Sequence, residues 1–331
     1  MKKFLTLMLM LVLNLSGNSL YAAGELIRVD GSSTVFPITE AVSEEFQKGS
    51  GGIKVMVGIS GTGGGFKRFC RGETDISDAS RPIKSKEQDS CKEGNIEYIE
   101  LPVAYDGLAV VVSKSNTWVD HLTVKELNKI WAPESQGVIT KWDQIRPEFP
   151  DAEIRLFGPG TDSGTFDYFT EVINGKSGKS RGDYTASEDD NVLVEGVASE
   201  KNAIGYFGLA YYEQNKDRLK LIPIDDENPS NGNGAITPSV ETVMAGTYQP
   251  LARPIFIYVS AASAKKDHIR KFLEYYLTHA APLVEEVGYI PLQEESYQAG
   301  LDRFQSNITG SVFNKGTDTR ITMAELLRME K

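Results

Sequence analysis

Three short loops rich in glycine and hydroxyl side chains have the residue types and spacing best suited to chemistry. They are residues 31–37 (GSSTVFP), 58–65 (GISGTGGG) and 158–165 (GPGTDSGT). Each leads into a segment with helical spacing, and a helix N-terminus presents unpaired N–H groups and a partial positive charge. Glycine lets a ligand approach the backbone, while Ser and Thr add hydroxyl donors. Three such loops converging on one point would bind a small oxyanion.

The segments around these loops predict an α/β fold. Apolar strands are expected at 26–29, 53–58 and 154–157, each running into one of the loops. Further strands are expected at 98–103 and within 105–112, the second of these buried on both faces. Alternating strand, loop and helix places the loops at the carboxyl ends of strands, where open α/β sheets bind ligands.

The N-terminus predicts a secretory signal peptide over residues 1–22. Lys2 and Lys3 precede an apolar run, and two small residues, Ala22 and Ala23, end the segment. We expect cleavage after one of these alanines. An uncleaved anchor helix is the alternative, although the apolar run is short for a membrane span.

The acidic composition limits the partners of the chain. The formal net charge is −11, and it becomes −13 without the leader, which carries two Lys and no acidic residue. Strong acidity disfavours nucleic acid and anionic membrane surfaces as partners. No other long apolar stretch follows, so we expect no membrane insertion of the mature chain. A chain of 331 residues favours two cores rather than one.

The chain has two cysteines, Cys70 and Cys91. An even number in an exported protein predicts a disulfide, which would stabilise the fold by about 3 kcal/mol in the chain-entropy model. A pair of buried free thiols is the alternative. The three histidines, His121, His268 and His279, lack the spacing of metal ligands, so we expect no metal site.

Common catalytic motifs do not fit these loops. The nucleotide P-loop requires a Lys after its last glycine, and none follows Gly164. The Gly-x-Ser-x-Gly elbow of hydrolases is missing around Ser60 and Ser163. A Ser-His-Asp triad would have to use one of the three scattered histidines. The sequence therefore favours a binding protein over an enzyme, with a secreted hydrolase as the alternative.

Six segments, taken in order, resemble the periplasmic phosphate-binding proteins of high-affinity phosphate ABC transporters. They are DGSSTVFP at 30–37, GTGGGF at 61–66, DASRPI at 78–83, VAYDG at 103–107, DSGTF at 162–166 and GYIPL at 288–292. The resemblance runs from about residue 25 to about residue 310. Each motif alone is weak, whereas the ordered set is specific.

The resemblance implies a two-lobed periplasmic-binding-protein fold of type II, with a ligand cleft between lobes joined by two hinge strands. Residues 23–104 and 254–331 would form the first lobe, and residues 105–253 the second. The chain would cross between lobes near 102–106 and 250–255. Phosphate would be held between the lobes by hydrogen bonds, and lobe closure would present a surface to an inner-membrane permease.

The resemblance also implies a set of phosphate-binding residues. They are Ser33, Thr34, the Val35 N–H, Ser60, Gly61, Thr62, Ser80, Arg81, Ser163, Gly164, Thr165 and Arg181. The second loop can be aligned in two ways that differ by one residue. No cofactor is implied.

Two positions depart from the pattern of the family. Many relatives follow the Ala-Ser pair with an Asp that accepts the proton of hydrogen phosphate, where this chain has Arg81. Many also carry an Arg shortly before the Ser-Gly-Thr segment, where this chain has Pro159. The charge partner is therefore expected to be Arg81 or Arg181. The proton acceptor is expected to be Asp106 or Asp162.

The proton acceptor matters because it decides which anion binds. Sulfate has no proton to donate at neutral pH, so a carboxylate facing the ligand repels sulfate and accepts a hydrogen bond from phosphate. We predict a periplasmic monomer that binds orthophosphate and delivers it to the permease. A site without the acceptor would suit sulfate, molybdate or arsenate, and a phosphatase-like hydrolase is the enzymatic alternative.

Overall fold

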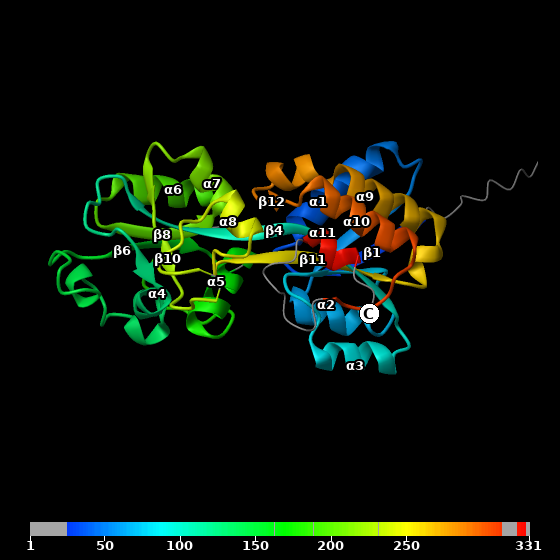
Figure 1. Cartoon of the computed structure of the whole chain (residues 1–331), viewed down its shortest axis with the longest axis horizontal. Coiled ribbons are helices and arrows are strands. Elements are labelled where there is room, and N and C mark those ends of the chain that lie inside the picture. The colour runs from blue at the N-terminus through cyan, green and yellow to red at the C-terminus, as the bar shows by residue number, and fades with distance from the viewer. Residues whose placement is uncertain (1–24, 162, 188, 231, 313–322, 329–331) are drawn as a thin grey trace, which may run out of the picture.

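The computed structural model describes residues 25–312, apart from 162, 188 and 231, and residues 323–328. Two lobes lie side by side in Figure 1, one built from both ends of the chain and one, in green, from its middle. Two strands, β4 (Tyr98–Ser113) and β11 (Ala252–Ser260), run between them. The predicted two-lobed α/β architecture is confirmed, whereas the predicted signal peptide lies outside the described residues.

Three parallel strands form one side of the sheet in the first lobe. β1 (Leu26–Gly31) lies between β2 (Lys54–Ile59) and β3 (Ile76–Ala79). β1 is followed by α1 (Phe36–Gly49), and β2 by α2 (Gly61–Phe69). Because parallel strands end at the same edge of a sheet, the first two ligand loops are neighbours. The rest of this lobe comprises α3 (Ser85–Glu93), α9 (Asp267–Glu286), α10 (Glu294–Gln305), α11 (Met323–Arg328), β12 (Ile290–Pro291) and a 3-10 turn at Ser263–Lys265.

Strand β4 carries the sheet from one lobe to the other and is buried along its whole length. Its first part pairs antiparallel with β11, and its last residues, 108–113, pair with the second-lobe strand β8 (Ala203–Gly208) and its neighbour β9. The sequence predicted two shorter strands here. The ladder continues past Pro102 because Val103 is bulged out of the pairing with β11, and a bulge tolerates proline in a strand.

Aromatic packing fixes the helix that follows the third loop. β6 (Arg155–Pro159) pairs parallel with β8 and leads toward α5 (Gly164–Asn174). Phe169 stacks on Tyr206 with ring centroids 3.7 Å apart, and Trp131 meets both rings edge-on. The rest of this lobe comprises β5 (Leu122–Thr123), β7 (Thr185–Ser187), β9 (Leu219–Leu221), β10 (Ile224–Asp225), α4 (Val124–Trp131), α6 (Asp190–Ser199), α7 (Leu209–Gln214), α8 (Val240–Met244) and 3-10 turns at Pro133–Ser135 and Trp142–Gln144.

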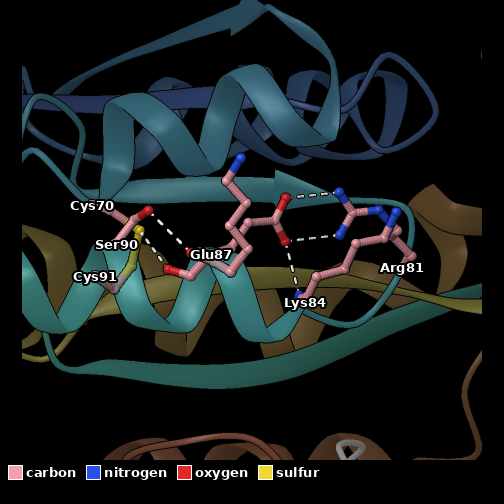
Figure 2. Close-up of a disulfide and its surroundings, with 7 residues drawn as sticks. Cys70, Arg81, Lys84, Glu87, Ser90 and Cys91 are labelled. Atoms are coloured by element: carbon pink, nitrogen blue, oxygen red, sulfur yellow. Dashed lines mark hydrogen bonds and ion pairs between the residues drawn. A yellow bond between two sulfur atoms is a disulfide. The ribbon is translucent and has the colours of Figure 1, made fainter.

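The predicted disulfide between Cys70 and Cys91 is confirmed, and Figure 2 shows its surroundings. Cys70 ends α2, the helix that follows the second ligand loop. Cys91 lies in α3, which follows the segment 78–83. The bridge therefore ties together the helices behind two of the candidate ligand segments.

We propose that the lobes divide as the sequence suggested, into residues 23–104 with 254–331 and residues 105–253. Both divisions fall where β4 and β11 run antiparallel to each other, with Asp106 directly opposite Arg253. In the described part of the chain, no helix is both long and apolar enough to cross a membrane.

Candidate functional site

Backbone hydrogen bonds fasten the ends of the three parallel strands to one another. The Ser32 N–H donates to the Asp78 carbonyl oxygen, and the Ser60 N–H donates to the Gly31 carbonyl oxygen, each at 3.0 Å. This close approach requires glycine at position 31. A Cβ there would lie 2.2 Å from the Asp78 carbonyl oxygen, and the φ of +149° disfavours other residues. The first two loops and the end of β3 therefore form one continuous surface.

Side-chain hydrogen bonds complete this surface. The Thr62 and Ser80 hydroxyls lie 3.0 Å apart, and the Ser80 N–H donates to Thr62 Oγ1 at 3.1 Å. Ser60 is used differently, because its hydroxyl donates to Asp30 Oδ2 at 2.7 Å. Arg68 Nη1 donates to the same carboxylate oxygen at 3.0 Å. Thr62 and Ser80 thus remain at the surface of the site, whereas the Ser60 hydroxyl supports the loop through Asp30.

A second carboxyl group, that of Asp78, is fully buried in the strand end that holds the first loop. Its Oδ1 accepts a hydrogen bond from the Thr39 hydroxyl at 3.1 Å, and its Oδ2 has no hydrogen-bond partner within the described residues. Burial, helped by the nearby charge of Asp30 and opposed by the Thr39 hydrogen bond, raises the pKa of Asp78 to about 8. The Asp78 carboxyl is therefore mainly neutral at pH 7.

The third loop supplies a helix end from the second lobe. Ser163 is the N-cap of α5, and its Oγ accepts a hydrogen bond from the Thr165 N–H at 3.2 Å. The loop before it is held by Tyr184, whose hydroxyl donates to the Pro159 carbonyl oxygen at 2.9 Å. The unpaired N–H groups of the first turn of α5 give this wall a partial positive charge.

The two lobes meet where Gly164 packs against Thr34. A Cβ at position 164 would lie 2.4 Å from Thr34 Oγ1 and 2.7 Å from the Thr34 backbone nitrogen. No side chain fits in that space, so glycine is required for this approach. The first and third predicted loops, more than a hundred residues apart in sequence, therefore touch across the cleft.

Two cavities that share Ser33 occupy the cleft on either side of this contact. One has a volume of about 240 Å³ and is lined by Ser32, Ser33, Thr34, Gly61, Thr62, Gly63, Ser80, Arg81, Lys84, Asp167, Tyr168, Glu171, Ser177 and Arg253. The other has a volume of about 290 Å³ and is lined by Ser33, Phe36, Pro37, Ile59, Asp106, Ser163, Gly164, Thr165, Asp190, Gly208, Tyr211, Val287, Gly288 and Tyr289. Most of the predicted phosphate-binding residues therefore gather in one place.

Three predicted phosphate-binding residues, Val35, Ser60 and Arg181, line neither cavity, and one predicted proton acceptor lies outside the described residues. The Ser60 side chain turns to Asp30, as described above. Val35 is fully buried in the core of the first lobe; the prediction for it concerned its backbone N–H, which lies beside Thr34 in the chain. Asp162, one of the two predicted proton acceptors, is the residue that the structure does not describe.

Arg81 lines the smaller cavity but is already paired within its own lobe. Its Nη1 and Nη2 donate to the two carboxylate oxygens of Glu87 at 2.9 and 2.8 Å, as Figure 2 shows. Glu87 in turn accepts the Lys84 N–H at the start of α3. This arrangement commits much of the Arg81 guanidinium to the cap of a helix.

Arg181 is not brought to the cleft. Its side chain is 3% exposed, and its Nη1 donates to the carbonyl oxygens of Ile130 and Ile139 at 2.9 and 3.0 Å. Its Nε and Nη2 bind the Asp183 carboxylate. Arg181 therefore joins segments inside the second lobe and lines neither cavity, so the prediction that it faces the ligand is not supported.

The cation that sequence reasoning missed is Arg253, on β11. Its Nε and Nη2 each lie 3.3 Å from Asp106 Oδ2, and Nη2 lies 3.4 Å from Thr34 Oγ1. Its guanidinium carbon lies 3.5 Å from the centre of the Tyr168 ring. Arg253 thus contacts the hinge strand β4, the first loop and α5. One feature of the sequence could have identified Arg253. It is a single Arg, in Ala-Arg-Pro, at the predicted crossover near 250–255 and directly before a buried apolar segment.

Asp106, the other predicted proton acceptor, is opposite Arg253 and is 2% exposed. Burial raises the pKa of the Asp106 carboxyl above its ordinary value, and the charge of Arg253 opposes that rise. Asp106 lines the larger cavity while Arg253 lines the smaller one. Their ion pair therefore lies between the two cavities. Within the described residues, no cluster of His, Cys, Asp or Glu is arranged to hold a metal ion.

A family model and two relatives of known name match most of this chain. A family model described as a PBP superfamily domain matches residues 18–279. The protein SphX of Synechococcus elongatus is 52% identical over 305 residues, which cover 92% of this chain and 89% of the relative. The phosphate-binding protein PstS of Staphylococcus saprophyticus is 36% identical over 285 residues, covering 85% of each.

Solved structures agree with this fold. The crystal structure of a possible phosphate binding protein from Planctomyces limnophilus is 46% identical, with a TM-score of 0.81, and covers 86% of this chain and 99% of that one. The structure of an ABC-type phosphate transport receptor from Vibrio cholerae has a TM-score of 0.61, and the match covers 81% of this chain and 100% of the receptor. At 23% identity, this likeness supports the fold alone.

Proposed function

The chain belongs to the PBP superfamily and to the family that includes SphX and PstS, and we propose that it is a receptor that binds inorganic phosphate. The observation that carries the proposal is the meeting of the loop at Ser33 and Thr34 with the N-terminus of α5 at Ser163 in one cleft. PstS of Staphylococcus saprophyticus and the Planctomyces limnophilus protein are both named for phosphate binding, which supports the same ligand.

The chemistry of the cleft suits a small tetrahedral oxyanion. Hydroxyl groups approach from both lobes, and the N-terminus of α5 adds N–H donors and a partial positive charge. Arg253 supplies a full positive charge without any metal ion. Asp106 supplies an acceptor for the proton that phosphate carries and sulfate lacks.

The rest of the proposal concerns where the receptor works. We propose that residues 1–22 direct export and are removed, and that the mature chain acts as a monomer in the periplasm. A disulfide between Cys70 and Cys91 supports an oxidising compartment. Closure of the lobes on phosphate would present a surface to an inner-membrane ABC permease, which takes up the anion.

Titration calorimetry of the purified mature chain tests the ligand. We expect a 1:1 complex with orthophosphate with a Kd of about 1 µM or lower and little heat from sulfate. Heat with sulfate, molybdate or arsenate but none with phosphate would replace phosphate with that oxyanion as the ligand. Prior dialysis against a phosphate-free buffer is required so that bound ligand does not mask the signal.

We also propose that the protein acts by binding alone, without catalysis. PstS of Staphylococcus saprophyticus is named for phosphate binding and the Vibrio cholerae receptor for phosphate transport, and neither name describes catalysis. Incubation with a chromogenic phosphate ester, with and without a chelator, checks this point. Sustained release of the chromophore that follows the protein through purification would contradict it and favour a phosphatase-like hydrolase.

A further inference from the structure

We propose that Arg253 is the cationic ligand of the bound anion, and that its pair with Asp106, which links the two hinge strands, couples anion binding to lobe closure. This inference rests on the proposed function, because it assigns the charge partner of the same anion. It adds a residue that lies in none of the three glycine-rich loops.

The position of the pair on the hinge is the first argument. Arg253 and Asp106 are directly opposed in the antiparallel ladder between β11 and β4, the two strands that run between the lobes. Cross-strand neighbours of this kind hold their two strands together. A ligand that binds one member of the pair therefore acts on both hinge strands.

The contacts of Arg253 with the two lobes are the second argument. Its Nη2 is 3.4 Å from Thr34 Oγ1, in the first loop of one lobe. Its guanidinium carbon is 3.5 Å from the centre of the Tyr168 ring, on α5 of the other lobe. The Tyr168 hydroxyl donates to the Pro250 carbonyl oxygen at 2.5 Å, just before β11. Arg253 thus meets both walls of the cleft as well as the hinge.

The unused hydrogen-bonding capacity of Arg253 is the third argument. Its bonds to Asp106 and Thr34, at 3.3 to 3.4 Å, are long for a charged donor. Its Nη1 donates no hydrogen bond within the described residues. Arg81, by contrast, holds Glu87 at 2.8 and 2.9 Å. Of the two arginines that line the smaller cavity, Arg253 has more donor capacity left for a ligand.

The consequence for the ligand follows from these contacts. A planar guanidinium offers donors in a fork that matches two oxygens of a tetrahedral anion. An anion that takes these donors in the smaller cavity lies against the hydroxyls of Thr34, Thr62 and Ser80. Asp106 lines the neighbouring cavity and is paired with Arg253, so the cation approaches the anion from the hinge rather than from a loop, with its partner carboxylate behind it.

Calorimetry on matched variants tests the assignment. We expect Arg253→Gln to raise the Kd for orthophosphate by about 100-fold or more. Arg253→Lys should lose less affinity for orthophosphate, because Lys keeps the positive charge but lacks the paired donors of the guanidinium. Arg81→Gln removes the same charge from the wall of the same cavity and should raise the Kd by less than Arg253→Gln does, because Arg81 is bound to Glu87. The control outside both cavities is Arg270→Gln, whose exposed side chain pairs with Asp267 and which should leave the Kd within about threefold. A loss for Arg81→Gln as large as that for Arg253→Gln overturns the assignment.

A double variant guards against misfolding as the cause. Arg253→Gln leaves the buried Asp106 without its partner, which can destabilise the chain. Asp106→Asn combined with Arg253→Gln removes both charges and should restore the thermal midpoint without restoring affinity. A double variant that binds phosphate within about threefold of the unmodified chain overturns the proposal.

Small-angle X-ray scattering tests the coupling to closure. The unmodified chain should contract when phosphate is added, and Arg253→Gln should contract less even at phosphate concentrations that saturate it. Equal contraction of the two overturns the coupling. If the unmodified chain binds sulfate and not phosphate, the proposed function fails and the same variants are titrated with sulfate, which keeps the two failures distinct. An unmodified chain that binds neither anion overturns both.

Discussion

The two walls of the cleft are built in different ways. In the first lobe, three strand ends are joined by hydrogen bonds at the Ser32 and Ser60 amides, above the buried carboxyls of Asp30 and Asp78. The second-lobe wall that meets the first is the helix end at Ser163, held by its own cap, with the preceding loop held by Tyr184. The first wall is therefore organised within its own lobe. The second becomes part of the site through its contact with the first.

This contrast predicts that substitutions in the two walls separate stability from affinity. Interactions inside a lobe persist whether the lobes are open or closed, so removing them changes the free energy of unfolding. If the lobes open and close as proposed, the contact between them forms only on closure, so disturbing it should shift the closure equilibrium. Two glycines, Gly31 and Gly164, test the contrast because a Cβ at either would meet backbone atoms.

The largest effect on folding is expected for Gly31→Ala. The new Cβ would lie 2.2 Å from the Asp78 carbonyl oxygen in the same lobe, and opening the cleft cannot relieve the clash. We expect the free energy of unfolding to fall by about 3 kcal/mol, which lowers the thermal midpoint by about 6 to 12 °C. The control is Gly63→Ala, where a Cβ meets no atom within 4 Å. A Gly31→Ala chain as stable as the control contradicts a preorganised first wall.

Gly164→Ala is expected to have the next largest effect, and to change the affinity for phosphate without changing stability. Its Cβ would lie 2.7 Å from the Thr34 backbone nitrogen, a clash that disappears when the lobes open. The Kd for phosphate should rise by about 100-fold, while the midpoint of the ligand-free chain should move by less than about 2 °C. Calorimetry and differential scanning measure the two quantities. A large loss of stability with unchanged affinity would reverse the comparison of the two walls.

Sequence predicted the parts of the site that depend on local pattern. Glycine, serine and threonine at strand ends predicted the loops, and the alternation of strands and helices predicted where those loops would meet. The disulfide followed from the cysteine count and the leader. These signals are local because a turn or a helix end is specified by a few adjacent residues.

The charged residues of the site could not be predicted in the same way. Arg81, Arg181 and Arg253 all lie near plausible ligand segments in the sequence, yet they play three different parts. Arg181 is buried against carbonyl oxygens of its own lobe, and Arg81 holds Glu87. The long side chain of an arginine reaches whichever partner the tertiary structure places nearby, so its role depends on contacts with distant residues. The length of β4 was predicted too short for a related reason. The bulge that allows Pro102 within the strand depends on pairing with β11, which the sequence does not show.

A smaller effect is expected on specificity, in Asp106→Asn. The amide keeps the shape of the side chain but removes the negative charge that repels a fully ionised anion and accepts the proton of phosphate. The ratio of the Kd for sulfate to the Kd for phosphate should fall by about tenfold. The control, Asp190→Asn, lines the same cavity and should leave the ratio within about twofold. An unchanged ratio in Asp106→Asn means that Asp106 does not face the anion.

The smallest effect concerns Asp78, which is buried beneath the first wall, and is measured as a pH dependence of the thermal midpoint. The pKa of Asp78 is raised to about 8, so the folded chain keeps this proton at pH values where the unfolded chain, with an ordinary aspartate pKa, has lost it. The contribution of Asp78 to stability therefore falls as pH rises from about 4 to about 8. Asp78→Asn removes this dependence. Its thermal midpoint relative to the unmodified chain should thus be higher at pH 8 than at pH 7 by about 2 °C or more.

Asp75→Asn is the matched control for this last test, because Asp75 lies just before the same strand, β3. Burial opposes ionisation of Asp75, yet hydrogen bonds from Lys266 and Ser263 hold the pKa of its carboxyl below the ordinary value. Its stabilising contribution is then fully present at both pH 7 and pH 8 and is lost only in acid. The midpoint difference for Asp75→Asn should therefore be the same at the two pH values. If Asp78→Asn follows the flat profile of Asp75→Asn, the first wall rests on an ionised carboxylate, and its organisation depends on charge rather than on a buried neutral acid.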